Sequence, residues 1–133
     1  MRGDEIMAPV KVRVAPDSSL RSVATALSDA RTGLAVIDMP GGGVFTERDL
    51  LRAIADGGDL DSTPVQGHAT TSPAAVAPDV SLDDACDLMI DRGVRHLLVE
   101  SDGRVIGVVN MRDVVGVLSG AAKLGAVPPA RGS

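Results

Sequence analysis

The chain almost lacks aromatic side chains: its 133 residues include no tryptophan, no tyrosine and a single phenylalanine, Phe45. Proteins that bind single-stranded nucleic acid stack bases on aromatic rings, so this class is disfavoured. The net charge of −5 also disfavours binding to duplex nucleic acid or a membrane surface, because such binding uses a basic face. We therefore expect no nucleic-acid partner and no membrane partner, and we expect aliphatic side chains and backbone groups to hold any flat ligand.

Further absences limit the compartment and the chemistry. A single cysteine, Cys86, leaves no internal disulfide, and no apolar run approaches the roughly 20 residues of a membrane span. The opening MRGDEIM is too short and too acidic for a signal peptide, so we expect a cytoplasmic protein. The chain has no nucleophile with an adjacent base, no paired-carboxylate arrangement and no glycine-rich phosphate fingerprint. This predicts that the protein is not an enzyme.

The isolated reactive side chains predict no metal site. His96 has no histidine or cysteine at ligand spacing, and neither has His68, so His96 is interpreted as a packing residue of a strand. Cys86 falls on the apolar stripe of a predicted helix, where a thiol behaves as a small hydrophobe. The acidic residues near it are interpreted as the solvated start of that helix: Asp83, Asp84 and Asp87.

What the chain does contain is an internal repeat. VAPDSSL at residues 14–20 returns as VAPDVSL at residues 76–82, an offset of 76 − 14 = 62 with six of seven positions identical. In each copy apolar residues then recur at i, i+3, i+4 and i+7, which predicts an amphipathic helix preceded by an N-cap serine, Ser19 or Ser81. The apolar stripes are Leu20, Val23, Ala24 and Leu27 in the first copy, and Leu82, Ala85, Cys86 and Met89 in the second.

Each predicted helix is followed by strands and by a second helix. Residues 34–38 in the first copy and residues 95–100 and 104–110 in the second are rich in β-branched residues, and Ser-Asp-Gly at 101–103 is a hairpin signal. The corresponding turn of the first copy is Pro-Gly-Gly-Gly at 40–43, with a hairpin two residues shorter. The second helices carry the apolar residues Leu50, Leu51 and Ile54 in one copy, and Val114, Val115 and Leu118 in the other.

The unit is therefore β-α-β-β-α, used twice in an α+β fold. About 60 residues bury too little apolar surface to be stable alone, so duplication supplies a partner surface. We expect a first repeat at residues 1–58, a linker at 59–67, a second repeat at 68–122 and a disordered tail at 123–133.

Both copies end their last strand in a related signature, GVFTERD at residues 43–49 and GVVNMRD at 107–113. One interpretation is purely structural, because Thr46 with Asp49 is close to a capping box and Asn110 is a good N-cap. The other is a ligand site, because a helix N-terminus suits phosphate and a carboxylate beside it suits ribose hydroxyls. Arg48 or Arg112 would then add a charged donor for phosphate. The two interpretations are compatible.

Three segments together resemble the CBS-domain pair, the tandem regulatory module named after cystathionine β-synthase. They are IMAPVKVRVAPDSSL at residues 6–20, GVFTERDLL at 43–51 and GVRHLLVESDGRVIGVVNMRDVV at 93–115. The resemblance covers residues 5–120 and implies two repeats packed about a pseudo-twofold axis with two clefts between them. It also implies that the clefts bind adenosine compounds, namely AMP, ADP, ATP or S-adenosylmethionine.

The resemblance also implies which residues hold the ligand. Asp49 with Thr46 would form one site and Asp113 with Asn110 the other, each Asp binding the ribose hydroxyls. Backbone groups of the early strands would lie near the adenine, at Met7, Ala8 and the residues up to Val10, and at Thr70, Thr71 and the residues up to Pro73. The chain departs from the family pattern at Asn110, which replaces the usual Ser or Thr and is bulkier, and at the shortened hairpin of the first copy.

The expected function is a non-catalytic, free-standing adenosine-ligand sensor that forms a homodimer through its helices and regulates a protein that the sequence does not identify. The alternative is a ligand-free interaction scaffold with the same fold and dimer, in which Thr46 and Asn110 act only as caps. An enzyme with unrecognised chemistry is a third possibility.

Overall fold

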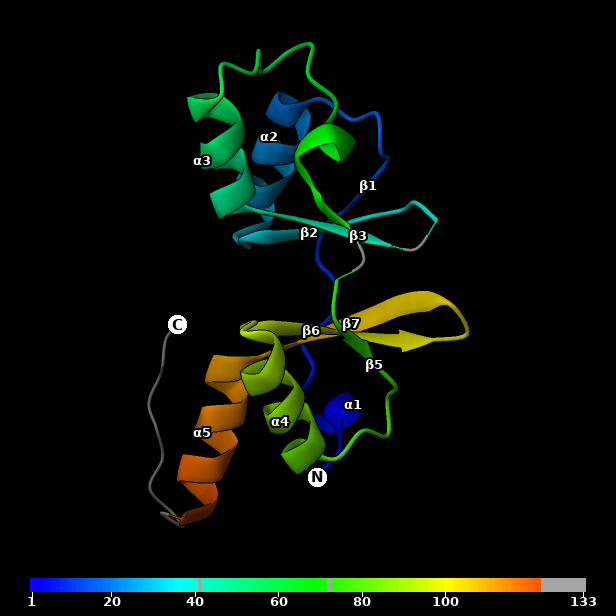
Figure 1. Cartoon of the computed structure of the whole chain (residues 1–133), viewed down its shortest axis with the longest axis vertical. Helices are drawn as coiled ribbons and strands as arrows, with labels where there is room; N and C mark the ends of the chain where they lie inside the picture. Colours follow the sequence, from blue (N-terminus) through cyan, green and yellow to red (C-terminus); the bar gives the residue numbers. More distant parts are fainter. Residues whose placement is uncertain (41, 72, 123–133) are drawn as a thin grey trace. The chain divides into compact units, whose positions relative to one another are not determined.

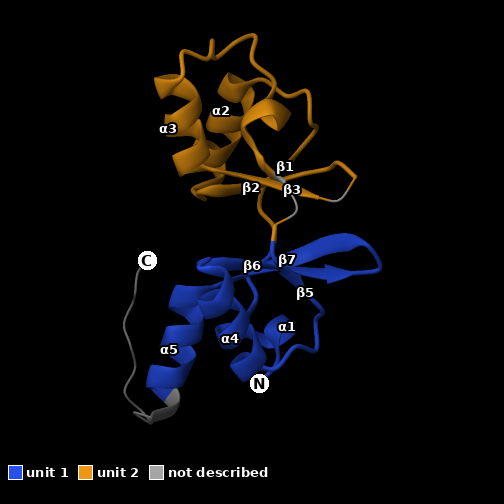
Figure 2. Cartoon of the chain, viewed as in Figure 1, with its two compact units in different colours: residues 1–9, 74–133 blue, residues 10–73 orange. Residues whose placement is uncertain are grey.

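The computed structural model describes residues 1–40, 42–71 and 73–122 (Figure 1). The chain divides into two compact units, Val10–Pro73 (unit 2) and Met1–Pro9 together with Ala74–Ser133 (unit 1) (Figure 2). Unit 1 is thus assembled from both ends of the chain. The expected tail at 123–133 lies outside the described residues, as do Gly41 and Ser72.

Unit 2 consists of a four-stranded sheet, with the strand order β1-β2-β3-β4, and helices (Figure 1). β1 runs parallel to β2, whereas β2 with β3 and β3 with β4 are antiparallel. Its elements in chain order are β1 (Arg13–Val14), α2 (Leu20–Ala30), β2 (Leu34–Ile37), β3 (Gly43–Thr46), α3 (Glu47–Ala55), the 3-10 helix η1 (Val65–His68) and β4 (Thr70–Thr71). The β-α-β-β-α order predicted for the first copy is confirmed.

Unit 1 repeats this arrangement with a longer hairpin. β5 runs parallel to β6, and β6 pairs antiparallel with β7 through a register shift between Val99 and Glu100. The predicted hairpin turn is confirmed, since Asp102 and Gly103 both adopt positive φ (53° and 76°). Its elements are α1 (Gly3–Ile6), β5 (Ala75–Val76), α4 (Leu82–Arg92), β6 (His96–Ser101), β7 (Arg104–Asn110) and α5 (Met111–Ala122).

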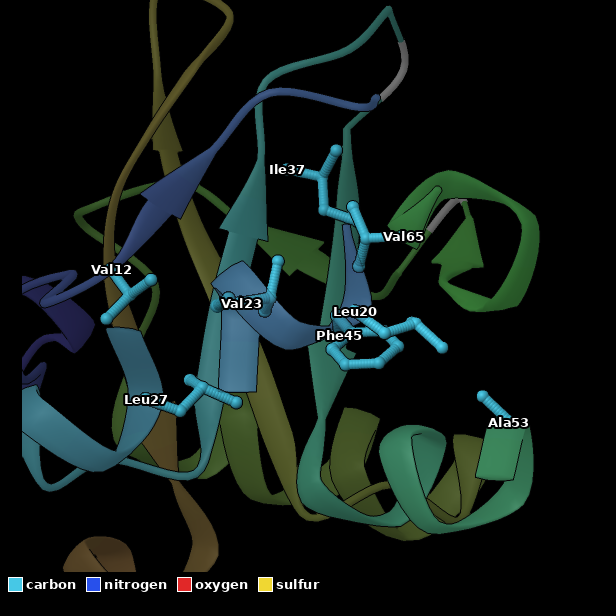
Figure 3. Packing of buried hydrophobic residues seen from close by; sticks show 9 residues of the cluster. Val12, Leu20, Val23, Leu27, Ile37, Phe45, Ala53 and Val65 are labelled. Carbon is cyan, nitrogen blue, oxygen red and sulfur yellow. The ribbon is translucent and has the colours of Figure 1, made fainter. Parts of the chain in front are cut away.

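Each unit has its own aliphatic core beneath its sheet. The predicted N-caps are confirmed, because Ser19 Oγ accepts from the Ser22 N–H (3.1 Å) and Ser81 Oγ from the Asp84 N–H (3.0 Å). Unit 2 encloses the lone phenylalanine (Figure 3), its buried cluster being Val12, Leu20, Val23, Leu27, Ala35, Ile37, Phe45, Ala53 and Val65. Unit 1 buries Ala85, Met89, Leu97, Val99, Val109 and Val114. The predicted stripes supply the helix side of both cores, with the exception of Ala24, which lies outside the unit 2 cluster; Ala26 and Ala30 pack there instead.

The segments that lead into the two repeats are exchanged between them. Residues 1–9, which precede the first repeat's strand, hydrogen-bond to the second repeat: the Gly3 N–H donates to Val80 O (2.8 Å). Residues 63–71 make the equivalent contacts on the first repeat, where the Val65 N–H donates to Ser18 O (2.7 Å). The two donors, Gly3 and Val65, are 62 residues apart, and so are the two acceptors, Ser18 and Val80. The exchanged segments therefore occupy equivalent positions in the two repeats.

The same exchange adds a strand edge to each sheet. β4 pairs with β3, with Thr70 opposite Val44, and Ala8 forms an isolated bridge opposite Val108 on β7. Two backbone bonds close the Ala8–Val108 bridge, at 2.8 and 2.9 Å. Gly107 permits this approach, because a Cβ there would lie 3.0 Å from Ala8 O and overlap the Met7 side chain. The leading segment of the chain therefore forms one edge of unit 1.

The ends of α2 and α4 differ in backbone strain. Arg31 closes α2 in the left-handed conformation (φ 54°), while its repeat equivalent Gly93 closes α4 in the same conformation (φ 64°). A side chain in this region costs free energy that glycine does not pay.

We expect Arg31→Gly to raise the free energy of unfolding by about 0.5–1 kcal/mol, because it removes this strain. The matched change Gly93→Ala should lower it by a similar amount, since an added Cβ at position 93 meets no atom within 4 Å and only the backbone changes. Urea unfolding followed by circular dichroism measures both. A destabilised Arg31→Gly protein would show that the arginine side chain contributes more than the strain costs.

Candidate functional site

In unit 2 the signature residues Thr46 and Asp49 bond to each other at the start of α3. Thr46 Oγ1 accepts from the Asp49 N–H (3.3 Å), and Asp49 Oδ2 accepts from the Thr46 N–H (2.9 Å). This is a capping box, which satisfies two backbone donors that the helix leaves free. The structural interpretation of these two residues is therefore confirmed.

The Asp49 carboxylate is enclosed as well as bonded. Its residue is 5% exposed, and the second oxygen, Oδ1, lies 3.4 Å from Arg52 Nη1 on the next turn of α3. Oδ2 also accepts from the Thr46 hydroxyl (3.2 Å). Both carboxylate oxygens are thus in use within the helix start, and a ligand would have to displace one of these partners.

The neighbouring strands complete the surroundings of this signature. Thr46 lies opposite Leu34 on β2, and Thr70 and Thr71 on β4 lie opposite Val44 and Gly43 on β3. β4 therefore brings the predicted residues Thr70 and Thr71 to the strand that ends at Thr46. Within unit 2 the structure thus places five of the predicted residues along β3 and the first turn of α3, including Arg48, which is exposed on that turn.

In unit 1 Asn110 takes the position of Thr46 but makes different bonds. Its Oδ1 accepts from the Arg112 N–H (2.8 Å), which confirms the capping role at the start of α5. Its Nδ2 lies 3.2 Å from Nε2 of His96, which stands directly opposite Asn110 in the β6–β7 register. His96 occupies the place that Leu34 has in unit 2, so an imidazole replaces an isobutyl group beside the signature.

The contact between His96 and Asn110 was missed by sequence reasoning. The available signal was the hairpin: counting back from Ser-Asp-Gly places His96 near Asn110, but the register shift at Val99 and Glu100 prevents an exact count. Burial lowers the pKa of the half-buried His96 imidazole below its usual value of 6.5, and the positive charge of Arg95 lowers that pKa further. The neutral ring is therefore favoured in the folded protein.

The remaining signature side chains of unit 1 are open to solvent. Arg112 and Asp113 are exposed, and within the described part of the chain the Asp113 side chain accepts no hydrogen bond and joins no ion pair. Met7 and the exposed Ala8 lie alongside β7, two residues before Asn110 in register. Asp113 is thus an available carboxylate at a helix start, whereas its equivalent Asp49 is occupied.

The described residues contain no group of three or more histidine, cysteine, aspartate or glutamate side chains that could hold a metal ion. Cys86 is half-buried beside the unit 1 core, and its thiol pKa is raised by burial and by the carboxylates of Asp83 and Asp87. The thiol is therefore held in its less nucleophilic form. Among residues 1–40, 42–71 and 73–122, no helix combines the length and apolarity needed to cross a membrane.

A hollow of about 360 Å³ opens on unit 2 between the end of α2 and the start of α3. It contains none of the predicted ligand residues. Its lining is mixed, with the charged side chains of Arg31 and Glu47 beside apolar groups: Ala24, Leu27, Ser28, Arg31, Thr32, Gly33, Glu47 and Leu50. The sequence has no recognisable motif at residues 31–33, and their spacing did not indicate this hollow.

Comparison with known proteins gives two matches to one family model, CBS domain, at residues 3–56 and 65–120. A CBS domain protein from Pyrobaculum aerophilum, solved in complex with AMP, is 32% identical, with a TM-score of 0.77 over 92% of this chain and 99% of that one. A CBS-domain containing protein from Agrobacterium tumefaciens is 27% identical, with a TM-score of 0.74 over 88% of this chain and 92% of that one.

Curated relatives are similar in sequence but mostly longer. An uncharacterised 17.7 kDa protein from Acidianus ambivalens is 35% identical over 109 residues, which are 79% of this chain and 65% of that protein. An arabinose 5-phosphate isomerase from Yersinia pestis is 34% identical over 105 residues, which are 77% of this chain and 32% of the isomerase. The chain thus spans less than two thirds of the length of these relatives.

We expect Asp49→Ala to lower the free energy of unfolding by about 1–2 kcal/mol, because it removes half of the capping box and leaves the N–H of the half-buried Thr46 without its partner. The matched change Asp113→Ala should alter it by no more than about 0.5 kcal/mol, as is usual for an exposed side chain. Urea unfolding of both variants measures the difference. Equal losses would show that Asp113 also has a structural partner.

Proposed function

Because the chain belongs to the CBS domain family, we propose that it is a non-catalytic regulatory module that binds an adenosine-containing ligand. Proteins of this family are generally regulatory modules, and the repeats cover most of the chain. The candidate ligands are AMP, ADP, ATP and S-adenosylmethionine. The proposal is supported above all by one observation: the Pyrobaculum relative, similar over nearly its whole length, was solved with AMP bound.

We place the ligand at the signature of unit 1. Asp113 has a free carboxylate that can accept hydrogen bonds from both ribose hydroxyls. The first turn of α5 offers a phosphate its partial positive charge and the Asp113 N–H, since the Met111 and Arg112 N–H groups already donate to Arg95 O and Asn110 Oδ1. Arg112, exposed on the same turn, adds a cation. Met7 and Ala8 beside β7 would supply backbone carbonyls and the methionine side chain to the adenine, because their N–H groups already donate to Gly3 O and Val108 O. The apolar side chain is in keeping with the near absence of aromatic residues.

Unit 2 offers the same elements in a less available form. Its site would be formed by Thr46, Asp49, Arg48, Thr70 and Thr71. The Asp49 carboxylate, however, is buried and already accepts hydrogen bonds from the Thr46 N–H, the Thr46 hydroxyl and the Arg52 guanidinium. Binding there would cost the capping box. This observation favours one occupied site over two, and it also supports the alternative function, a scaffold in which the signatures act only as helix caps.

The regulatory output would follow from linkage. A ligand shifts a conformational or association equilibrium only by its differential affinity for the two states. A ligand seated on the first turn of α5 contacts the helix whose outer face carries exposed apolar side chains, so binding and association can be coupled through one rigid element. The regulated protein would be one that associates with this chain in a ligand-dependent way.

The outer faces of α3 and α5 are the proposed homodimer surface. Leu51 and Ile54 on α3 are 69% and 47% exposed, and Val115 and Leu118 on α5 are 57% and 48% exposed. Their neighbours Leu50 and Val114 pack against the two cores, so each second helix is apolar on two faces. Covering the outer face would remove this apolar surface from water.

We expect AMP to stabilise the protein against heat, by about 2.7 kcal/mol at a concentration about 100 times Kd. Differential scanning calorimetry with each of the four ligands measures the shift, since a chain without tryptophan or tyrosine has little intrinsic fluorescence. Asp113→Ala should abolish the shift without destabilising the free protein. If none of the four ligands at millimolar concentration shifts the transition, the scaffold function is favoured.

For the dimer, Leu51→Glu and Leu118→Glu should each shift sedimentation velocity towards the monomer, because each places a charge in an apolar interface. The matched control is Ile90→Glu on α4, where the native side chain is 71% exposed but lies outside the proposed surface. A wild-type protein that sediments as a monomer at about 100 μM would contradict the proposed dimer, because even a weak dimer forms at a concentration of this order.

A further inference from the structure

The bonds of Asn110 fix the protonation state of His96. The Arg112 backbone N–H can only donate, so the Asn110 atom 2.8 Å from it is the carbonyl oxygen Oδ1. The amide nitrogen Nδ2 therefore faces His96 Nε2 at 3.2 Å, and Nδ2 can also only donate. Nε2 must then carry a lone pair, which makes His96 a neutral imidazole with its proton on Nδ1.

Protonation of His96 is incompatible with this arrangement. A proton on Nε2 would oppose the Nδ2 hydrogens of Asn110, donor against donor. Rotating the amide by a half-turn would let Oδ1 accept from Nε2–H, but Nδ2 would then face the Arg112 N–H, and the first turn of α5 would lose its cap. Either way one of the two hydrogen bonds is lost, so the charge on His96 and the capping of α5 are linked.

We propose that His96 is a positioning residue of the unit 1 signature: its neutral form holds the Asn110 amide in the orientation that caps α5, and its protonation releases that orientation. The inference rests on the proposed function only in its last step, which is that an adenosine ligand seated beside Asp113 binds the capped form more tightly. Unit 2 has no counterpart, because Leu34 stands where His96 does.

The charges around the ring leave the imidazole to respond to pH. On β6 itself Arg95 opposes protonation of His96, and β7 presents the uncharged Asn110. The charged residues at the adjoining ends of α4 and α5 are Asp91, Arg92, Arg112 and Asp113, all exposed to solvent. The short helix α1, which packs on β7, carries the half-buried Asp4 and the exposed Glu5. Burial acts in the same direction as Arg95. The folded state therefore binds the proton less readily than the unfolded chain, and stability contributed by His96 is present above pH 6.5 and lost as the pH falls below it.

The first experiment needs no ligand. Long-range ¹H–¹⁵N NMR at pH 7.5 reports the tautomer of each imidazole, and His68→Gln assigns the signals because the chain has two histidines. We expect His96 to have its proton on Nδ1. The Nε2–H tautomer would overturn the proposal, because it cannot accept from Asn110.

The second experiment separates positioning from packing by two substitutions. His96→Gln offers a carbonyl that can accept from Asn110 but does not titrate, and His96→Leu reproduces the neighbour that unit 2 has. As the pH falls from 7.5 to 5, the melting temperature of His68→Gln should follow that of wild type. We expect a smaller decrease in melting temperature for His96→Gln than for wild type, and the difference between the two decreases measures the effect of protonating His96. A His96→Gln protein with the full wild-type fall would contradict the linkage.

The ligand arm uses AMP and isothermal titration calorimetry over the same range of pH. The AMP phosphate itself titrates near pH 6, so each affinity is compared with that of His96→Gln, in which this contribution is unchanged. As the pH falls from 7.5 to 5, we expect the AMP affinity of wild type and of His68→Gln to decrease on the order of tenfold more than that of His96→Gln. This factor corresponds to the free energy of one helix cap. His96→Leu should bind AMP more weakly than wild type at pH 7.5, and its AMP affinity should change with pH as that of His96→Gln does.

The arms distinguish the two hypotheses. If AMP binds to no variant at any pH, the proposed ligand fails, while the tautomer and the melting temperatures still decide the role of His96. If AMP binds with the same pH dependence in wild type and His96→Gln, the link between His96 and the ligand is refuted while the proposed function stands.

Discussion

The structure depends on the exchange of the two leading segments. Each unit needs a segment from outside its own repeat to close one end of its fold: residues 63–71 complete unit 2, and residues 1–9 complete unit 1. Backbone hydrogen bonds, such as the paired bonds of Ala8 with Val108, hold these segments, and apolar side chains such as Val65 and Ile6 pack on the two cores. Strand edges that would otherwise be left open are thereby satisfied, and the signature at the end of each last strand gains a neighbouring strand.

The repeated parts of the fold were predictable because they depend on side chains. The helix stripes, the capping serines and the Asp-Gly turn are indicated by residue types, and they are confirmed except at Ala24 of the first stripe. Only the ends of the leading segments, from Met7 and from Thr70, were given the same role. Residues 59–67 were interpreted as a linker, since MRGDEIMAP and TPVQGHATT share no residue at any of their nine positions. Their equivalence lies in backbone bonds, which many sequences can make. The resemblance to the CBS family could still be recognised, because it rested on the repeated motifs and not on the leading segments.

The residues of the candidate site could be identified from the sequence, but the difference between its two copies could not. Spacing identified Thr46, Asp49, Asn110 and Asp113, but it could not show that one carboxylate is buried within a capping box while the other is exposed. That difference arises because a threonine hydroxyl reaches the third backbone N–H of its helix, while the Asn110 oxygen takes the second and its nitrogen turns to His96. Exchanging one short polar side chain for another thus redistributes a whole set of bonds.

The exchanged segments bear on how such a chain could arise from a single repeat. One repeat with its own leading segment would lack the segment that closes it, yet two identical copies could close each other by trading leading segments, as in a domain-swapped pair. Joining those copies end to end would make the trade intramolecular and free of any dependence on concentration. Each copy could then change separately, as the divergence of Thr46 from Asn110 and of Leu34 from His96 illustrates.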